Sequence, residues 1–527
     1  MRNAARAVAG PLEERPTSVD PVLLAGVAGL GLLSLALLVI GDGNLGLGLA
    51  PLAIALVVLA IIKIPLRYSM LAIGFLCLTL ENPNEAFAAN RWHSPLAVLG
   101  ALLLAHLNVT IPVKALFFSG LDLVLLFFAC VWAIRRMTGS QVDVCGHVPP
   151  AQPVRQAGLI SLAAVFLFWG FGMLQGGFSF GDSLWQLFRL VYLPCVFLLF
   201  CACLRGPEDA RPLGIALLLA ALFRACVAIY VRSLFPSTEI LPHATTHADS
   251  MLFADAFTLI LVIFFERPTL RNLGLAAATL PILSWGLIAN NRRLGWVELG
   301  ICLLVLYLFT PMTRLKRRIA QGVVLSIPLA VIYIGIGWSH PTGVFAPVQT
   351  IRSVVDSQSD TSTLWRDLEN YDLYSTLRTN PVLGTGLGHA YIETIQLPDI
   401  SEGYSLYRYA PHNSILGLFA YTGLLGFAAI WMILPLGIFF AVRSYRFSTQ
   451  PRDRTAALTS VGVLVAYMVH CYGDMGLGTF TSVFTVGAAL ALMAKQAVAT
   501  GAWPMRPRSG ADQPTKSGES ELSSTVA

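Results

Sequence analysis

Charged residues are scarce in this 527-residue chain. Asp, Glu, Lys and Arg together make up 12% of it, whereas aliphatic and aromatic residues make up 56%. A water-soluble fold is excluded, because so few polar side chains cannot cover so much apolar material. A membrane β-barrel is excluded as well, since the apolar runs at 22–40, 159–174, 213–231, 273–289 and 477–493 approach the roughly 20 residues that a spanning helix needs.

Cysteines outside the apolar runs are also few. Seven of the nine cysteines lie in apolar runs, Cys145 lies in a basic loop, and only Cys471 is expected to face outside. A disulfide framework is therefore not expected. The first apolar run has full spanning length and lacks a small-residue cleavage site, so we expect it to remain as the first span.

Basic clusters between the apolar runs set the predicted topology, because cytoplasmic loops are enriched in Lys and Arg. This rule predicts an all-α polytopic membrane protein with about 12 to 14 transmembrane helices, provided that 94–108 does not cross alone. One large periplasmic loop with short helices carries eight acidic residues against four arginines. The predicted parts are a cytoplasmic N-terminus (1–18), a transmembrane region (19–338), the loop (339–411), a periplasmic helix with the C-terminal spans (412–499) and a disordered cytoplasmic tail (500–527).

Arginines gather at the predicted outer face, where the positive-inside rule does not expect them. Arg292 and Arg293 occupy a short outer turn. Three more arginines fall in the same layer: Arg189, Arg224 and Arg232. Charges at membrane depth cost about 2.5 to 3.5 kcal/mol each and usually face a cavity or a partner. These residues predict a cationic pocket for an anionic lipid headgroup, or else they snorkel to lipid phosphates and pair with Asp182 or Asp249.

His412 follows Pro411 at the point where the long loop ends and an apolar run begins. Proline suits the first turn of a helix, so His412 is expected at a helix N-terminus. The helix dipole disfavours an imidazolium there and keeps a neutral ring available as a proton acceptor. His412 is therefore a candidate general base, although a capping or interfacial role also suits a lone histidine at a helix start.

Other polar patterns are weaker. His243, His247 and Asp249 do not have the spacing of a known metal site, and a structural or acceptor-binding role is expected for them. His470 and Asp474 flank a helix end and suit packing or capping as well as function. The glycine-rich stretch 384–388 is not followed by Gly-Lys-Ser/Thr, so it is interpreted as a turn and not as a phosphate loop.

Several motifs in the second half of the chain share one order with a known family. His412-Asn413 is followed after nine residues by Gly423-Leu-Leu-Gly426, and the stretch 380–388 has the pattern Asn-Pro-Val-Leu-Gly-Thr-Gly-Leu-Gly. Together they resemble the bacterial O-antigen ligase and Wzy-type polysaccharide polymerase superfamily.

Two further segments add to the resemblance, which covers roughly 290–426 in order. Ser362 and Arg366 resemble the Ser and Arg that precede the glycine stretch in the family. The segment 291–296 is similar to the Ser-Arg-Gly segment that opens the conserved region, with Asn and Arg in place of Ser or its neighbours. That substitution leaves open whether Arg292 or Arg293 contacts phosphate.

The resemblance implies an inner-membrane glycosyltransferase of lipopolysaccharide or exopolysaccharide assembly. It would transfer a glycan from an undecaprenyl-pyrophosphate carrier to an acceptor saccharide, either lipid A-core or a growing polysaccharide, on the periplasmic side. No metal or other cofactor is implied, the anomeric centre would invert, and nucleic acid is not a partner. The implied catalytic residues are His412, Arg292 and Arg293, and the implied substrate-binding residues are Arg189, Arg224, Arg232, Arg366, Arg408 and Asn413.

Other functions stay open at this point. The His-Asn signature favours a ligase, the high span count favours a polymerase, and transfer onto a protein side chain is a related option. A secondary transporter or flippase for an anionic or lipid-linked substrate is the alternative from another class. It predicts charges near the bilayer midplane and internal repeats, and no repeat is evident in the sequence. A purely structural role is disfavoured by the cationic pocket.

Overall fold

The computed structural model describes residues 21–40, 43, 45–81, 94–106, 118–139, 147–236, 238, 241–340, 343–345, 348–349, 351–352, 361–399 and 406–504. Within these residues the regular elements are helices, and no β-strand is present. Nine helices of this part are long and apolar enough to cross a membrane, and three shorter apolar helices, Ala25–Ile40, Gly48–Lys63 and Leu66–Thr79, accompany them. The predicted all-α polytopic class is confirmed, while the number of crossings stays a prediction.

The chain divides into two compact units, Met1–Pro65 and Leu66–Ala527. In the first unit, α1 (Pro21–Ile40) packs against α2 (Leu45–Lys63). Both helices expose large apolar side chains, among them Leu32, Val39 and Leu56. Such surfaces suit contact with lipid tails better than contact with water.

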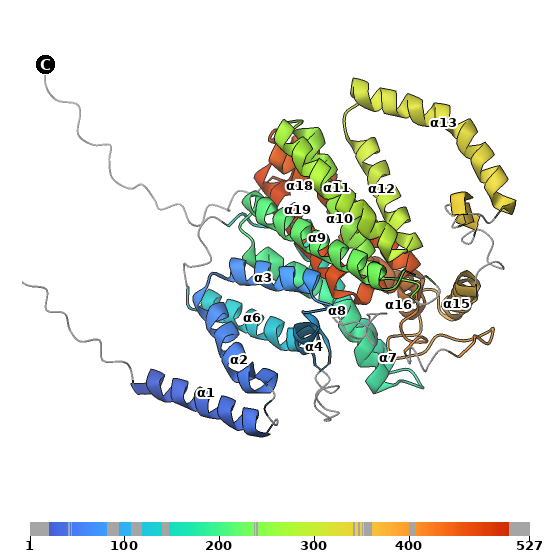
Figure 1. Cartoon of the computed structure of the whole chain (residues 1–527). Coiled ribbons are helices and arrows are strands. Elements are labelled where there is room, and N and C mark those ends of the chain that lie inside the picture. Colours follow the sequence, from blue (N-terminus) through green and yellow to red (C-terminus); the bar gives the residue numbers. More distant parts are fainter. Residues whose placement is uncertain are drawn as a thin grey trace, which may run out of the picture. The chain divides into compact units, whose positions relative to one another are not determined.

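The second unit holds the other helices (Figure 1). Before the large loop these are α3 (Leu66–Thr79), α4 (Ala97–Leu104), α6 (Gly120–Met137), α7 (Gln152–Met173), α8 (Phe180–Cys203), α9 (Ala210–Leu234), α10 (His247–Glu266), α11 (Leu270–Asn290), α12 (Arg293–Phe309) and α13 (Arg314–Ser339). The described part of the loop contains the 3₁₀ turn η2 (Gly343–Phe345) and α15 (Thr361–Thr379). After it come α16 (Ser414–Trp431), α17 (Ile433–Phe447), α18 (Pro451–Gly473) and α19 (Phe480–Ala499).

The core of this unit lies where α10, α18 and α19 meet. α10 packs against α9, α11, α12 and α18, and α19 packs against α8, α17 and α18. The apolar window of α19 is 83% buried, whereas that of α13 is 0% buried. α19 is thus an interior helix, and the apolar surface of α13 is left for lipid.

α4 agrees with the expectation that 94–108 does not cross the bilayer alone. It has eight residues, which is about 12 Å of helix against a hydrocarbon core of about 30 Å. Residues 107 and 108 lie outside the described part.

Candidate active site

A cavity of about 760 Å³ lies at one end of the second unit. Its walls come from the end of α4, the start of α6, α8, the α9–α10 and α11–α12 connections, the start of α15, the residues before α16 and the α18–α19 connection. Five predicted site residues line it: Arg189, Arg292, Arg293, Arg366 and His412. Ligand pockets in proteins span about 300 to 1,000 Å³, so the volume is that of a small-molecule site. Loops that the distribution of basic residues predicted to lie on the same side of the membrane therefore meet around this cavity.

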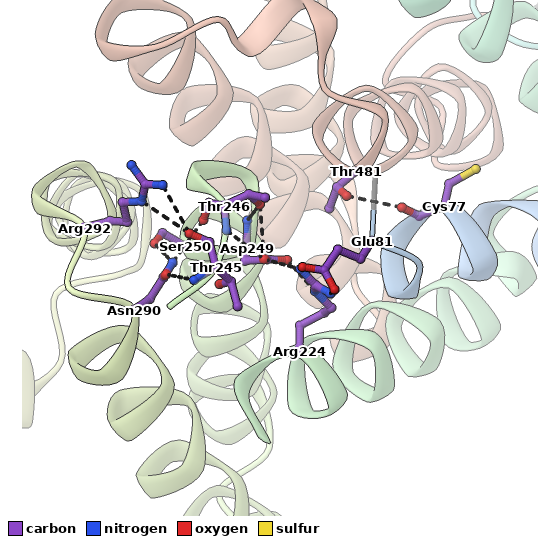
Figure 2. A network of polar contacts seen from close by, with 10 residues as sticks. All are labelled: Cys77, Glu81, Arg224, Thr245, Thr246, Asp249, Ser250, Asn290, Arg292 and Thr481. Carbon is purple, nitrogen blue, oxygen red and sulfur yellow. Dashed lines mark hydrogen bonds and ion pairs between the residues drawn. The ribbon is translucent and has the colours of Figure 1, made fainter. Parts of the chain in front are cut away.

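Arg292 is held in place by the turn that carries it. Asn291 has a left-handed backbone (φ 54°, ψ 38°) and ends α11, a conformation that asparagine tolerates better than most residues. The Arg292 Nε and Nη2 atoms donate to the Thr245 carbonyl oxygen at 3.3 and 3.2 Å, and Nη1 lies 2.6 Å from His247 Nε2. Figure 2 shows Asn290 fixing the same segment through Thr245 and Ser250.

Electrostatics at the cavity favour an anion. Burial lowers the pKa of Arg292 to about 10, partly opposed by Asp474, so the guanidinium stays charged at neutral pH. Burial, followed by Arg292, lowers the pKa of His243 to about 4, which keeps that ring neutral. Burial alone would raise the pKa of Asp474, but His247, other histidines and Arg366 hold it below its ordinary value.

Arg224 forms a buried ion pair and does not line the cavity. Its side chain is 2% exposed, and its Nε and Nη2 atoms donate to the two oxygens of Asp249 at 2.8 and 2.6 Å. Glu81 lies 4.0 Å from Nη1 on the other side (Figure 2). Thr246 caps α10 by accepting the Asp249 backbone N–H, and the same Asp249 carboxylate accepts the Thr246 N–H in return. The pairing with Asp249, which the sequence left as the alternative for this residue, is what the structure shows.

Arg232 and Arg408 also contact protein groups and do not line the cavity. Arg232 lies within the last turn of α9 and donates to the carbonyl oxygens of Ala289 and Leu241 at 3.0 and 2.8 Å. Arg408 forms an ion pair with Glu393 at 2.7 Å and is 48% exposed. Both therefore hold connections together, and the sequence-based prediction that they bind substrate finds no support in their geometry.

His412 precedes its helix instead of lying in the first turn, which corrects the predicted helix start. α16 begins at Ser414, and Asn413 is its N-cap, accepting the Leu416 N–H at 3.1 Å. The Asn413 amide also donates to Asn370 at 3.0 Å, so its side chain is used in capping and loop packing. The dipole argument for His412 consequently loses its geometric basis.

Glu369 is the residue that holds His412 in place, and its negative charge acts on the ring in the opposite sense to a helix N-terminus. This α15 residue is fully buried, and its carboxylate accepts the His412 backbone N–H at 3.1 Å and lies 3.4 Å from Nδ1. Trp365 packs edge-on against the imidazole, with ring centroids 5.0 Å apart. When Nδ1 donates to the carboxylate, Nε2 is the basic nitrogen of the ring, as in other histidine–carboxylate pairs that act as bases.

The glycine-rich stretch is a tightly packed turn, as interpreted from the sequence. It runs between α7 and α16, where the Gly386 N–H donates to the Tyr421 carbonyl oxygen at 2.8 Å. Gly423 bends α16 with φ 59° and ψ −168°, and a Cβ there would lie 2.3 Å from the Val382 carbonyl carbon. Glycine is required at such a position because no side chain fits. This turn and kink place the start of α16 beside α15.

Two acidic residues at or near the cavity did not follow from the sequence: Glu369 was missed, and the role of Asp474 was left open. Glu369 lies three residues after Arg366, so an α-helical reading of 361–379 would have put both on one face. Its partner His412 lies 43 residues away, and no local pattern signals that contact. For Asp474 the sequence left packing or capping and a functional role equally open, and the residue lines the cavity.

Comparison with known proteins agrees with this geometry. Residues 278–432 match the family model Wzy_C, which describes O-antigen ligases. The chain carries an O-antigen ligase domain. The resemblance predicted from 290–426 is thereby confirmed for this segment, which is similar to O-antigen ligases. No curated protein matches the chain.

The O-antigen ligase domain contributes most, but not all, of the predicted residues at the cavity. Arg292, Arg293, Arg366 and His412 lie within it, whereas Arg189 comes from α8, upstream of the matched segment. The cavity therefore depends on helices outside the domain.

Proposed function

We propose that the protein is an inner-membrane glycosyltransferase that moves a glycan from an undecaprenyl-pyrophosphate carrier to a saccharide hydroxyl on the periplasmic side. The observation that carries the proposal is the joint presence, around one cavity, of four arginines and the His412–Glu369 pair. The O-antigen ligase domain supports the reaction class.

The arginines provide the donor site. Arg189, Arg292, Arg293 and Arg366 approach the cavity from three separate parts of the chain. Guanidinium groups bind phosphate oxygens through paired N–H donors and keep their charge when buried. Preorganised cations also stabilise negative charge as it develops on a leaving group. A pyrophosphate held among them would be both anchored and activated.

His412 provides the base. Its imidazole removes the proton of the acceptor hydroxyl while that oxygen attacks the anomeric carbon. The bond from this carbon to the phosphate oxygen breaks, and its electron pair leaves with the carrier pyrophosphate. Attack opposite to the leaving group inverts the anomeric centre. Glu369 stabilises the imidazolium that forms, and the proton then passes to water in the cavity.

The deciding experiment is a transfer assay with full-length protein in proteoliposomes and carrier-linked repeat units, with and without lipid A-core. His412→Ala should lose at least about 100-fold in turnover while keeping carrier binding. Arg292→Ala should weaken carrier binding, whereas Arg378→Ala, an exposed arginine stacked on Tyr374, is the matched control and should behave as wild type. Retained turnover in His412→Ala would remove it from the mechanism. Product formed only with lipid A-core identifies a ligase, and chain extension without it identifies a polymerase.

Orientation has its own test. Tyr371 on α15 is 51% exposed near the cavity end, and Glu208 is exposed in the 3₁₀ turn η1 (Pro207–Asp209), after the far end of α8. In intact spheroplasts, an impermeant thiol reagent should label Tyr371→Cys but not Glu208→Cys. The reverse pattern would put the cavity on the cytoplasmic side and refute the proposed location.

The transporter alternative has one observation in its favour. Asp255 in α10 and Glu298 in α12 are fully buried, and ionisable residues inside a membrane are typical of ion and substrate pathways. Proteoliposomes distinguish the two functions. Carrier-linked glycan that crosses the bilayer without any transfer product would favour a flippase, and product without movement would exclude it.

A further inference from the structure

A second polar cluster lies inside the helix bundle, where α10, α12 and α18 cross. Its members are Asp255, Glu298 and His470, and each is 0% exposed. Cys302 adjoins the cluster and donates to the Gly462 carbonyl oxygen at 3.6 Å. None of the cluster acids lines the cavity of the candidate active site as described above.

Asp255 is the unusual member. Neither oxygen of its carboxyl group has a hydrogen-bond partner within the described part of the chain. An ionised carboxylate without partners in an apolar interior costs far more than a fold of ordinary stability can offset. The group avoids this cost by binding a proton, because a neutral acid loses much less on leaving water.

Glu298 and His470 extend the cluster. Glu298 Oε1 lies 2.8 Å from His470 Nδ1, and Oε2 has no hydrogen-bond partner among the described residues. Asp255 and Glu298 are also close enough to interact electrostatically. Two carboxyl groups at such a distance cannot both be ionised at low cost, so a shared proton is favoured.

The cluster lies below the floor of the cavity. Asp255 is eight residues into α10 from His247, about 12 Å along the helix, and His470 is one turn before Asp474, about 6 Å. The Asp474 N–H donates to the His470 carbonyl oxygen at 2.8 Å, so the two residues are adjacent at the end of α18. His470 thus lies between the cavity and the buried acids.

Other charged groups on the packed helices are engaged elsewhere. Arg224 on α9 pairs with Asp249 near the cavity, and Lys495 on α19 donates to the Val148 carbonyl oxygen at 2.9 Å. The electrostatic neighbour of Asp255 is Glu298 on α12.

We propose that Asp255 and Glu298 form an intramembrane proton-binding site that communicates with the cavity through His470. At neutral pH the proton resides on Asp255, and it removes one of the two negative charges that the buried carboxylates would otherwise carry, while Glu298 stays paired with His470. The proposal goes beyond the transfer reaction and does not depend on it.

Infrared spectroscopy of the purified full-length protein tests the site without any activity assay. The wild type at neutral pH should show the C=O stretching band of a protonated carboxyl group. Biosynthetic incorporation of ¹³C-carboxyl aspartate should shift part of that band, and Asp255→Asn should remove the aspartate part. Glu208→Gln, which changes an exposed acid, is the matched control and should leave the band unchanged.

If Asp255→Asn does not fold, the spectrum of wild-type protein labelled with ¹³C-carboxyl aspartate still decides the question. A band that is unmoved by ¹³C-aspartate would show that Asp255 is ionised and would refute the proposal. A sodium-dependent rise in the unfolding temperature of wild type, together with a missing protonated band, would also refute it by making the occupant a metal cation.

Discussion

Replacing Glu369 by Gln tests the pairing on which the proposed base depends. The Glu369 carboxylate accepts the His412 backbone N–H at 3.1 Å and lies 3.4 Å from Nδ1. Glutamine keeps the size and an acceptor oxygen but removes the charge, so the imidazolium formed during transfer loses its counter-ion. A hydrogen bond to a charged group contributes about 1.5 to 3 kcal/mol. At about 1.36 kcal/mol per tenfold in rate, kcat should fall about 10- to 150-fold.

The assay is glycan transfer in proteoliposomes, with kcat and KM measured across pH. The donor KM should stay near the wild-type value, because Glu369 is buried behind His412 and is not part of the arginine site. Glu393→Gln is the matched control. It makes the same change in the same loop, but there the carboxylate pairs with the half-exposed Arg408 and accepts the Tyr407 hydroxyl, and such surface ion pairs are worth about 0 to 1 kcal/mol. An unchanged kcat in Glu369→Gln, or an equal loss in both variants, would refute the assignment of Glu369 as a positioning residue.

Three further predictions concern the scaffold. Arg224→Ala should lower the free energy of unfolding by about 3 to 5 kcal/mol because it leaves the buried Asp249 carboxylate unpaired; thermal unfolding in detergent measures this, and an unchanged unfolding temperature would contradict it. Gly423→Ala should cost about 1 to 3 kcal/mol through backbone strain, since φ is 59° and its Cβ would meet backbone at 2.3 Å, whereas Gly300→Ala, with nothing within 4 Å, should be neutral or stabilising; equal effects would refute the argument. Acidification from about pH 6.5 to about 4 should lower the free energy of unfolding. In this range the unfolded chain binds a proton at His243, whereas in the folded protein the pKa of His243 is lowered to about 4 and the ring stays neutral. His243→Gln should flatten that part of the stability profile, and a profile identical to wild type would contradict the assignment.

Helix positions followed from the sequence wherever an apolar run filled a span. The runs at 213–231 and 477–493 correspond to α9 (Ala210–Leu234) and α19 (Phe480–Ala499), because hydropathy over about 20 residues is a local property that lipid selects directly. The start of α16 was set wrongly because Pro411 and Asn413 both suit a helix start, and the observed cap uses the Asn413 side chain. Local preference left that choice open, and packing against α15 settled it.

The distribution of charges along the sequence identified the unusual arginines but could not tell which of them form ion pairs and which line the cavity. Arg224 and Arg292 carry the same anomaly in sequence, a cation at the predicted outer face. Arg224 donates two hydrogen bonds to Asp249, whereas Arg292 lines the cavity. Their difference depends on which carboxylate the fold brings within about 3 Å, and spacing along the chain does not encode that.

The order of the family motif reflects architecture more than chemistry. Within it, His412 lines the cavity, while Asn413 caps α16 and Gly423 lets the helix bend around the 380–388 turn. The glycines matter because they bring α16 against α15, and α15 supplies Glu369 to the base. Arg189 and Asp474 reach the same cavity from helices outside the matched segment. Recognising the motif therefore identifies the scaffold and part of the site, whereas the complete cavity also needs residues that the motif does not contain.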